Sequence, residues 1–297
     1  MAARFTYILV VLIWSTTPLA IKLGNASFAP MANVSLRIAL AVMVGSIVCT
    51  VTGYGVLNIR RHWLLYLAAS VGIFPNMILV YTAAEYISSG LISVLFGLTP
   101  FFTAVLGRVL FGDVGVSRLQ AVAIALACVG LACIFVEPGG EYSEAYTGVL
   151  LMLVSNVLFS LSALWVKTLG ARFDVAPTEQ AIGAMVFALP GLLLFWFVVE
   201  GYEPIEFTVG SSLALLYLAL CGSLLGFVAY YFILKSMSVG AVALIPLMSP
   251  VLAIFLGGLV INEPISVMMV VGVGIIIVAL AMHQGILLAL VHRLRRR

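Results

Sequence analysis

The sequence repeats itself at a spacing of 150 residues, and this repeat constrains the fold more than any single residue does. Six positions recur in kind: Tyr81 and Tyr231, Ser88 and Ser238, Gly90 and Gly240, Pro100 and Pro250, Gly107 and Gly257, and Asp113 and Glu263. Ser15 and Lys22 recur as Ser160 and Lys167, at a spacing of 145. The change in spacing falls near the acidic stretch 137–144, which we interpret as the join between two similar halves, 1–138 and 145–297.

The composition places these halves in a membrane. Of 297 residues, 64% are hydrophobic and 8% are charged, whereas a soluble domain has roughly 45–50% apolar and about 25% charged residues. A soluble chain this apolar would expose large adhesive patches, so lipid is its natural solvent and partner. The net charge of +3 gives no indication of nucleic-acid binding. The four cysteines lie in apolar runs, where free cysteine packs as a small apolar side chain. No Cys/His spacing resembles a metal site, and no cofactor is expected.

Ten segments are long and apolar enough to be membrane helices, which need about 20 such residues. They are 5–24, 29–52, 63–82, 87–111, 117–136, 146–168, 177–199, 211–234, 240–261 and 266–289. The connections between them are short. We therefore expect an all-α integral membrane protein with ten transmembrane helices.

The positions of Lys and Arg predict the orientation of these helices. With the N-terminus in the cytoplasm, twelve of the fourteen cations lie on the inner side, Lys22 lies on the outer side and Arg37 lies within a span. Because cytoplasmic loops are enriched in cations, both termini are expected inside, in a cytoplasmic membrane. Each half holds five spans, an odd number, so the second half must enter the membrane inverted. Duplicated membrane bundles are typical of secondary transporters, whose substrate site lies between the repeats.

Several segments together resemble the drug/metabolite transporter superfamily, in particular its ten-helix EamA-type branch. They are Ile-Trp-Ser-Thr-Thr-Pro at 13–18 running into Lys22, Arg37, the segments 81–90, 98–102 and 111–113, and their echoes at 231–240, 248–251 and 261–264. The resemblance implies two inverted five-helix halves, a cavity lined by the early helices of each half, and export of small metabolites such as amino acids. Asp113 stands where the family usually has Glu, which keeps the charge.

Arg37 is the sharpest candidate for a functional residue. It lies about eight residues inside its span, roughly 12 Å along the helix. A charge at that depth is costly and usually faces a cavity or a partner. It could therefore bind a substrate carboxylate or act as an electrostatic gate. The alternatives are that it snorkels outward or pairs with Glu85.

The remaining candidates are polar or aromatic residues at mid-depth, which in lipid must face protein or water. As cavity residues we expect Trp14, Ser15, Arg37, Asn76, Tyr81, Phe96, Asn156, Ser160, Trp165 and Tyr231. Prolines kink helices, and the lysines that end spans one and six are related by the repeat. As gating or hinge candidates we expect Pro18, Lys22, Pro100, Lys167 and Pro250, with interfacial anchoring and fixed packing as the alternatives. Asp113 and Glu263 are expected to cap or hold neighbouring helices.

These features favour a monomeric secondary carrier that moves a small organic solute by alternating access. No nucleotide-binding GxxxxGK[ST] loop is present, so the chain itself is not expected to hydrolyse ATP. A passive facilitator or channel-like pore competes with this interpretation, because no Asp or Glu lies at mid-span to carry protons. An intramembrane enzyme is disfavoured, because the three histidines lie near span ends and no nucleophile and base converge.

Overall fold

All regular secondary structure in the described part of the chain is helical, as the composition predicts. The structure is a computed structural model and describes residues 2–112, 117–134, 142–201, 205–236, 245–263, 265–283 and 285. The helices are α1 (Ala2–Asn25), α2 (Pro30–Thr52), α3 (Ile59–Ser70), α4 (Asn76–Tyr86), α5 (Ser89–Phe96), α6 (Thr99–Phe111), α7 (Arg118–Ile134), α8 (Tyr142–Gly170), α9 (Pro177–Val199), α10 (Val209–Tyr217), the π-helix η1 (Leu218–Leu225), α11 (Gly226–Ser236), α13 (Ile245–Ile261) and α14 (Val267–His283).

Many of these helices have the length and apolarity of membrane helices. Six stretches are long and apolar enough to cross a bilayer: 3–25, 30–52, 89–110, 145–170, 177–199 and 209–236. Three more apolar helices are shorter, at 118–134, 252–261 and 267–283. Large apolar side chains such as Leu194 and Phe255 are well over half exposed on the outer surface. Such a surface suits lipid, and helices satisfy their own backbone hydrogen bonds there.

Two of the expected spans are divided by short breaks. Segment 63–82 becomes α3 and α4, with Pro75 at the N-cap position of α4. Segment 87–111 becomes α5 and α6, with Pro100 in the first turn of α6. Proline has no backbone N–H to donate and is tolerated in a first helical turn. These two prolines therefore mark places where a helix restarts.

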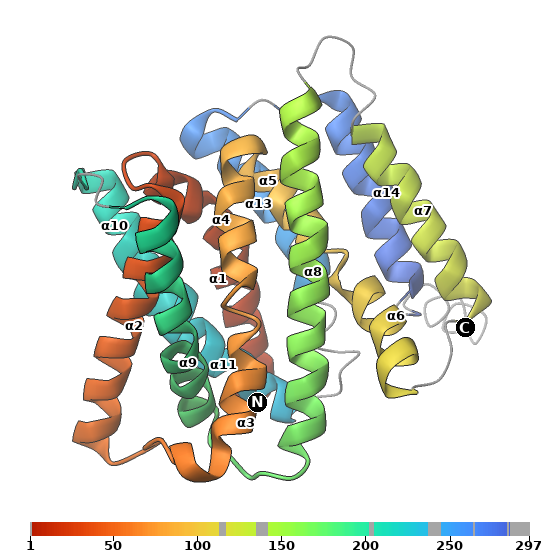
Figure 1. Cartoon of the computed structure of the whole chain (residues 1–297). Coiled ribbons are helices and arrows are strands. Elements are labelled where there is room, and N and C mark those ends of the chain that lie inside the picture. The colour runs from red at the N-terminus through yellow and green to blue at the C-terminus, as the bar shows by residue number, and fades with distance from the viewer. Residues whose placement is uncertain are drawn as a thin grey trace.

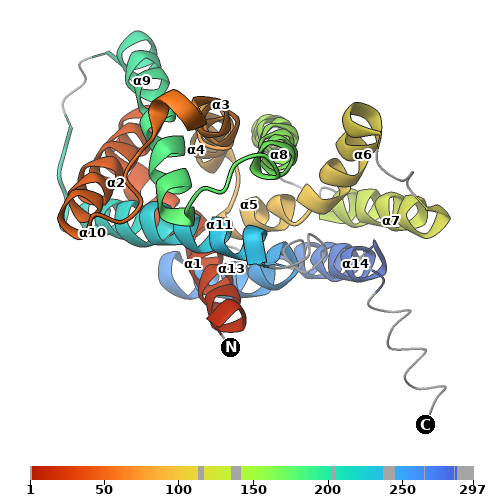
Figure 2. The same ribbon diagram turned by 90° about the horizontal axis from the view of Figure 1, so that it is seen from below.

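The helical bundle has a lower and an upper end in the view of Figure 1. The lower end carries the N-terminus and the start of α3, and the upper end carries the starts of α8 and α14. α1 lies among the other helices and packs against α2, α4, α5, α10, α11 and α13. α7 and α14 lie side by side at one edge of the bundle in both views (Figures 1 and 2). Their backbones approach closely, because a Cβ on Gly130 would stand 2.7 Å from the carbonyl oxygen of Gly272.

Candidate functional site

A cavity of about 100 Å³ lies between the helices and is lined from both halves of the chain. Of the residues predicted from the sequence, Trp14, Pro18, Arg37, Asn76, Tyr81 and Phe96 line it. They come from α1, α2, α4 and α5. The cavity also has residues that the sequence prediction missed, among them Phe159 of α8, Gly222 of η1 and Phe227 of α11. The early helices of the first half thus contribute most of the expected lining.

Arg37 is buried at this cavity, with 2% of its surface exposed. Its Nε donates to Ser223 Oγ at 2.6 Å, and Nη1 donates to the Tyr81 hydroxyl at 3.0 Å. Gly222 leaves room for the guanidinium, because a Cβ there would lie 3.1 Å from Nη2. Glu85, the alternative partner, instead accepts a hydrogen bond from Asn25 at 2.6 Å. Arg37 therefore neither snorkels outward nor pairs with Glu85, and it joins the two halves at the cavity.

The apolar side of the cavity is a cluster of aromatic rings. The Trp14 ring lies 6.2 Å from Phe159 and 5.2 Å from Tyr230, measured between centroids. Phe159 in turn lies 5.9 Å from Tyr230. Thr16, on the same turn as Trp14, makes a short hydrogen bond with the Tyr217 hydroxyl. These contacts hold Trp14 inside the bundle, where its indole contributes apolar surface to the cavity.

Four pairs of lining residues are related by the spacings of the sequence repeat. Trp14 and Phe159 lie 145 positions apart, and Gly72 and Gly222, Met77 and Phe227, and Thr99 and Ser249 lie 150 positions apart. Residues related by the sequence repeat thus line one cavity. Applied to the predicted Trp14, the repeat spacing would have identified Phe159 from the sequence, whereas Gly222 and Phe227 are counterparts of Gly72 and Met77, which were not among the predicted residues.

Two predicted asparagines hold the helix breaks. Asn76 donates to the Gly72 carbonyl at 3.0 Å and accepts from Ser155 Oγ at 2.6 Å. Asn156 donates to the Leu95 carbonyl at 2.8 Å and accepts from Thr99 Oγ1 at 2.6 Å. Buried backbone groups freed at a break need such partners. Both asparagines thus stabilise the restarted helices, and Asn76 also faces the cavity.

Four other cavity candidates lie away from the lining. The Ser15 hydroxyl donates to the Val11 carbonyl within α1. Ser160 bonds to the Thr99 carbonyl and to Thr103 on α6. Tyr231 is buried and stacks on Phe227. Trp165 lies on the surface of α8 with 43% of its area exposed. Ser15 and Ser160 therefore make bonds to helix backbones, and Trp165 occupies a position suited to lipid.

Lys22 lies at the upper end, in a network that joins the two halves. Its Nζ donates to the Ile87 carbonyl at 3.0 Å and lies 3.6 Å from Glu263 Oε1. Glu263 also accepts hydrogen bonds from the backbone N–H and the hydroxyl of Ser89, at 2.8 and 2.6 Å. Glu263 therefore holds the start of α5, as expected of a residue that caps a neighbouring helix. Asp113, its counterpart in the first half, lies outside the described residues.

The other gating candidates occupy different surroundings. Pro18 lies within α1 at the cavity. Pro100 opens α6, and Pro250 lies inside α13. Lys167, the repeat counterpart of Lys22, is exposed near the end of α8. The upper end has a further link between the halves, because both carboxylate oxygens of Glu200 accept the first backbone N–H groups of α2, at 2.8 and 2.9 Å.

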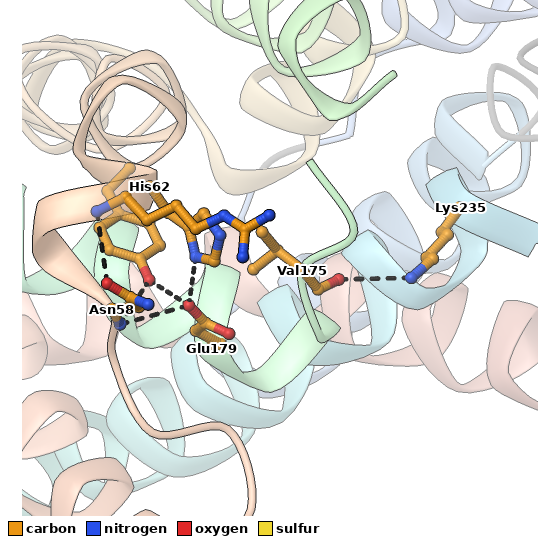
Figure 3. A network of polar contacts seen from close by, with 7 residues as sticks. Asn58, His62, Val175, Glu179 and Lys235 are labelled. Carbon is orange, nitrogen blue, oxygen red and sulfur yellow. Dashed lines mark hydrogen bonds and ion pairs between the residues drawn. The ribbon is translucent and has the colours of Figure 1, made fainter. Parts of the chain in front are cut away.

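A polar network at the lower end, which the sequence patterns did not predict, is shown in Figure 3. The Glu179 carboxylate of α9 contacts the His62 ring of α3. Nearby, Lys235 of α11 donates to Asp174 at 2.5 Å and to the Val175 carbonyl at 3.4 Å. The hydrogen bond that Lys235 donates to Asp174, together with the positive charge of Lys235, lowers the pKa of the exposed Asp174 carboxyl below its ordinary value. No sequence signal pairs residues 62 and 179, because the fold alone brings their helices together.

The helical bundle, its lipid-suited surface and its internal cavity are those of a polytopic membrane protein. Residues 2–136 and 146–283 match the EamA-like transporter family, so the chain belongs to that family and to the drug/metabolite transporter superfamily. It is similar to an uncharacterized transporter of Archaeoglobus fulgidus, at 23% identity over 92% of this chain and 95% of the relative. It is also similar to the uncharacterized inner membrane transporter YedA of Escherichia coli K12, at 25% identity over 91% and 87%.

A solved crystal structure shares the fold. Its TM-score is 0.68 at 18% identity, covering 95% of this chain and 96% of that one. The family match confirms the predicted resemblance, and the chain is a membrane transporter.

Proposed function

We propose that the protein is a secondary transporter that exports a small organic acid, such as an amino acid, across the cytoplasmic membrane by alternating access. The observation that carries the proposal is the cavity where repeat-related residues meet, with one buried arginine on its wall. Substrate sites of repeat-built carriers lie near the bilayer midplane at the repeat interface. Family membership supports transport, and the solute and the direction are part of the proposal.

The topology we propose has ten spans in two inverted halves, 1–138 and 145–297, with both termini in the cytoplasm and a monomer as the working unit. We assign the ten spans to the six long apolar helices, the three shorter ones and the divided α3–α4 segment. Under this topology the lower end in Figure 1 is cytoplasmic, and Lys22 and Glu263 lie on the outer side.

The chemistry of the cavity favours an anionic solute with an apolar part. A guanidinium has five N–H donors, and the bonds of Arg37 to Ser223 and Tyr81 use two of them. The remaining donors suit a carboxylate, which arginine binds through two parallel hydrogen bonds. Trp14, Phe96 and Phe159, which line the same cavity, offer apolar surface for the rest of the solute.

The network of Lys22, Ser89 and Glu263 at the upper end, which we call the outer network, supports a gating role for Lys22 in this cycle. Lys22, Ser89 and Glu263 link α1 and α5 of the first half to the segment after α13 in the second. In a carrier of this kind such a contact forms when the outer side closes and breaks when it opens. Lys167 at the repeat-related position would serve the cytoplasmic side.

A flux assay tests the proposed function. Purified protein in liposomes is given radiolabelled amino acids and other small carboxylic acids one at a time. We expect saturable uptake of at least one of them, inhibited by an excess of the unlabelled solute, and none in protein-free liposomes. Uptake that is unsaturable and equal for all solutes supports the alternative, a channel-like passive pore, and overturns the carrier.

A further inference from the structure

A buried carboxylate–imidazole pair at the lower end has no part in solute binding as proposed above. Glu179 lies in the first turn of α9, and His62 in the first turn of α3. Their side chains are 12% and 10% exposed, and His62 Nδ1 lies 2.7 Å from Glu179 Oε1 (Figure 3). Tyr66 donates a short hydrogen bond to the same oxygen, and the backbone N–H of Asn58 lies 3.4 Å from it. One carboxylate oxygen therefore collects three hydrogen-bonding groups.

This geometry can hold one more or one fewer proton without exchanging partners. An ionised carboxylate only accepts hydrogen bonds, so Nδ1 of His62 carries a proton when Glu179 is charged. A second proton on the imidazole makes the pair neutral overall, and the same proton can reside on the carboxyl instead. Because the two groups share one hydrogen bond, a proton added to either of them changes the charge of the pair as a whole. Loss of that proton leaves a net negative charge in a largely buried site, which is unfavourable without a partner.

Among the groups around the pair, His62 is the principal counterion of the Glu179 carboxylate. Arg60 and Arg61, which precede His62 on α3, are exposed. On the loop before α9, Asp174 is exposed and is paired with Lys235 of α11. On α2, which also packs against α9, Cys49 carries a buried free thiol. Among the described residues, no lysine or arginine forms an ion pair with Glu179, so its charge depends on the imidazole.

The pair lies between helices that also build the cavity. α3 leads through a short break to Gly72 and Asn76, both of which line the cavity. α9 packs against α3 and against α2, the helix that carries Arg37. Gly183, one turn after Glu179, touches the ring of Tyr66, because a Cβ there would lie 2.4 Å from it. A charge change at the pair therefore acts directly on the contact between the first and second halves.

We propose that Glu179 and His62, positioned by Tyr66, form a proton-binding site that couples solute movement to the proton gradient. The proton-bound pair is neutral and keeps α3 and α9 together. When the proton leaves, the uncompensated carboxylate draws in water and loosens this contact at the cytoplasmic end. Ionisable residues inside membrane proteins commonly form such proton relays. The coupling rests on the proposed transport function, whereas proton binding itself does not.

The first experiment measures proton binding without any solute. Infrared difference spectra are recorded for the full-length protein in lipid nanodiscs as the pH is lowered. We expect pH-dependent bands of the pair in the wild type, from a protonated carboxyl if the proton is on Glu179 or from the carboxylate and imidazolium if it is on His62. These bands should be lost in Glu179→Gln and remain in Asp174→Asn. Glutamine keeps an oxygen that accepts from Tyr66, so this variant should stay folded. If Glu179→Gln leaves the spectrum unchanged, the site is overturned.

The second experiment measures coupling in liposomes that contain a pH-sensitive dye and receive a mixture of the standard amino acids. We expect solute-driven proton movement in the wild type and in Asp174→Asn, and its loss in Glu179→Gln, which should still exchange solute for solute. Equal proton movement in Glu179→Gln overturns the coupling. If the wild type moves none of these solutes while the pH-dependent bands of the pair are present, the proton site stands and the proposed substrate class fails.

Discussion

Replacing Arg37 should weaken solute binding strongly while lowering the amount of folded protein much less. In Arg37→Ala the cavity loses its buried charge together with the hydrogen bonds that the guanidinium would make to a carboxylate. A hydrogen bond to a charged group contributes about 1.5–3 kcal/mol, and loss of a two-bond contact should therefore weaken binding by roughly 100-fold or more. Ser223 and Tyr81 lose one partner each, but both are neutral hydroxyl groups, and removing a buried charge lowers the cost of membrane insertion.

Arg37→Lys separates the charge from its geometry. Lysine keeps the positive charge but loses the planar fork that binds a carboxylate through two bonds. It also cannot hold Ser223 and Tyr81 in the present arrangement and still reach a ligand. We expect an intermediate loss, about tenfold in affinity, for this variant. Arg60→Ala is the matched control, because Arg60 is exposed at the lower end and should bind solute as the wild type does.

The assay is equilibrium binding of a solute found in the liposome screen, together with its initial rate of uptake. Each variant is first checked for a single symmetric peak in size-exclusion chromatography, which distinguishes lost binding from lost folding. If folded Arg37→Ala binds and transports like the wild type, Arg37 is structural, and the binding site must be sought around Trp14 and Asn76.

Three further predictions address the gate, the topology and the loop ion pair. Glu263→Ala removes two hydrogen bonds and one ion pair from the network of Lys22, Ser89 and Glu263. The probe is a Ser93→Cys substitution in the cavity of a protein whose native cysteines have been replaced. Glu263→Ala should raise the rate at which an impermeant thiol reagent labels this cysteine from outside. An unchanged labelling rate would argue against a gate there. Reporter domains fused after Gly140 should be periplasmic and those after Arg297 cytoplasmic, and a cytoplasmic Gly140 fusion would end the inverted-repeat argument. Because its folded-state pKa is lowered, Asp174 stabilises the fold above its ordinary pKa, and this contribution is lost as the pH falls through the lowered value. Asp174→Asn should thus lessen the acid dependence of thermal stability slightly, and an unchanged dependence would show that the pair contributes nothing measurable.

The apolar composition was sufficient to predict the helical bundle, and the family was predicted from the resemblance of several segments and their echoes in the second half. They also predicted that Arg37, Trp14 and Tyr81 would lie at one cavity, because buried polar and aromatic groups at mid-depth must face protein or water. The helix breaks at Pro75 and Pro100 could be anticipated only as kinks. Their full separation depends on side chains from α8 that satisfy the freed backbone groups.

Contacts between distant helices could not be predicted from the pattern. Ser160 is polar and deep, as a cavity residue would be, yet it bonds to the backbone of α6. Glu179 follows a proline at a span end and resembles an ordinary interfacial residue in sequence. Its burial against His62 results from the packing of α9 on α3, which no periodicity encodes.

Counterflow in liposomes tests the central claim, alternating access through the Arg37 cavity, most directly. Vesicles preloaded with unlabelled solute are placed in a trace of labelled solute, and the label inside is followed with time. A carrier predicts a transient accumulation of label above its outside concentration in the wild type and in Arg60→Ala, and none in Arg37→Ala. Simple equilibration of the label without overshoot in the wild type would contradict a carrier and indicate an open pore.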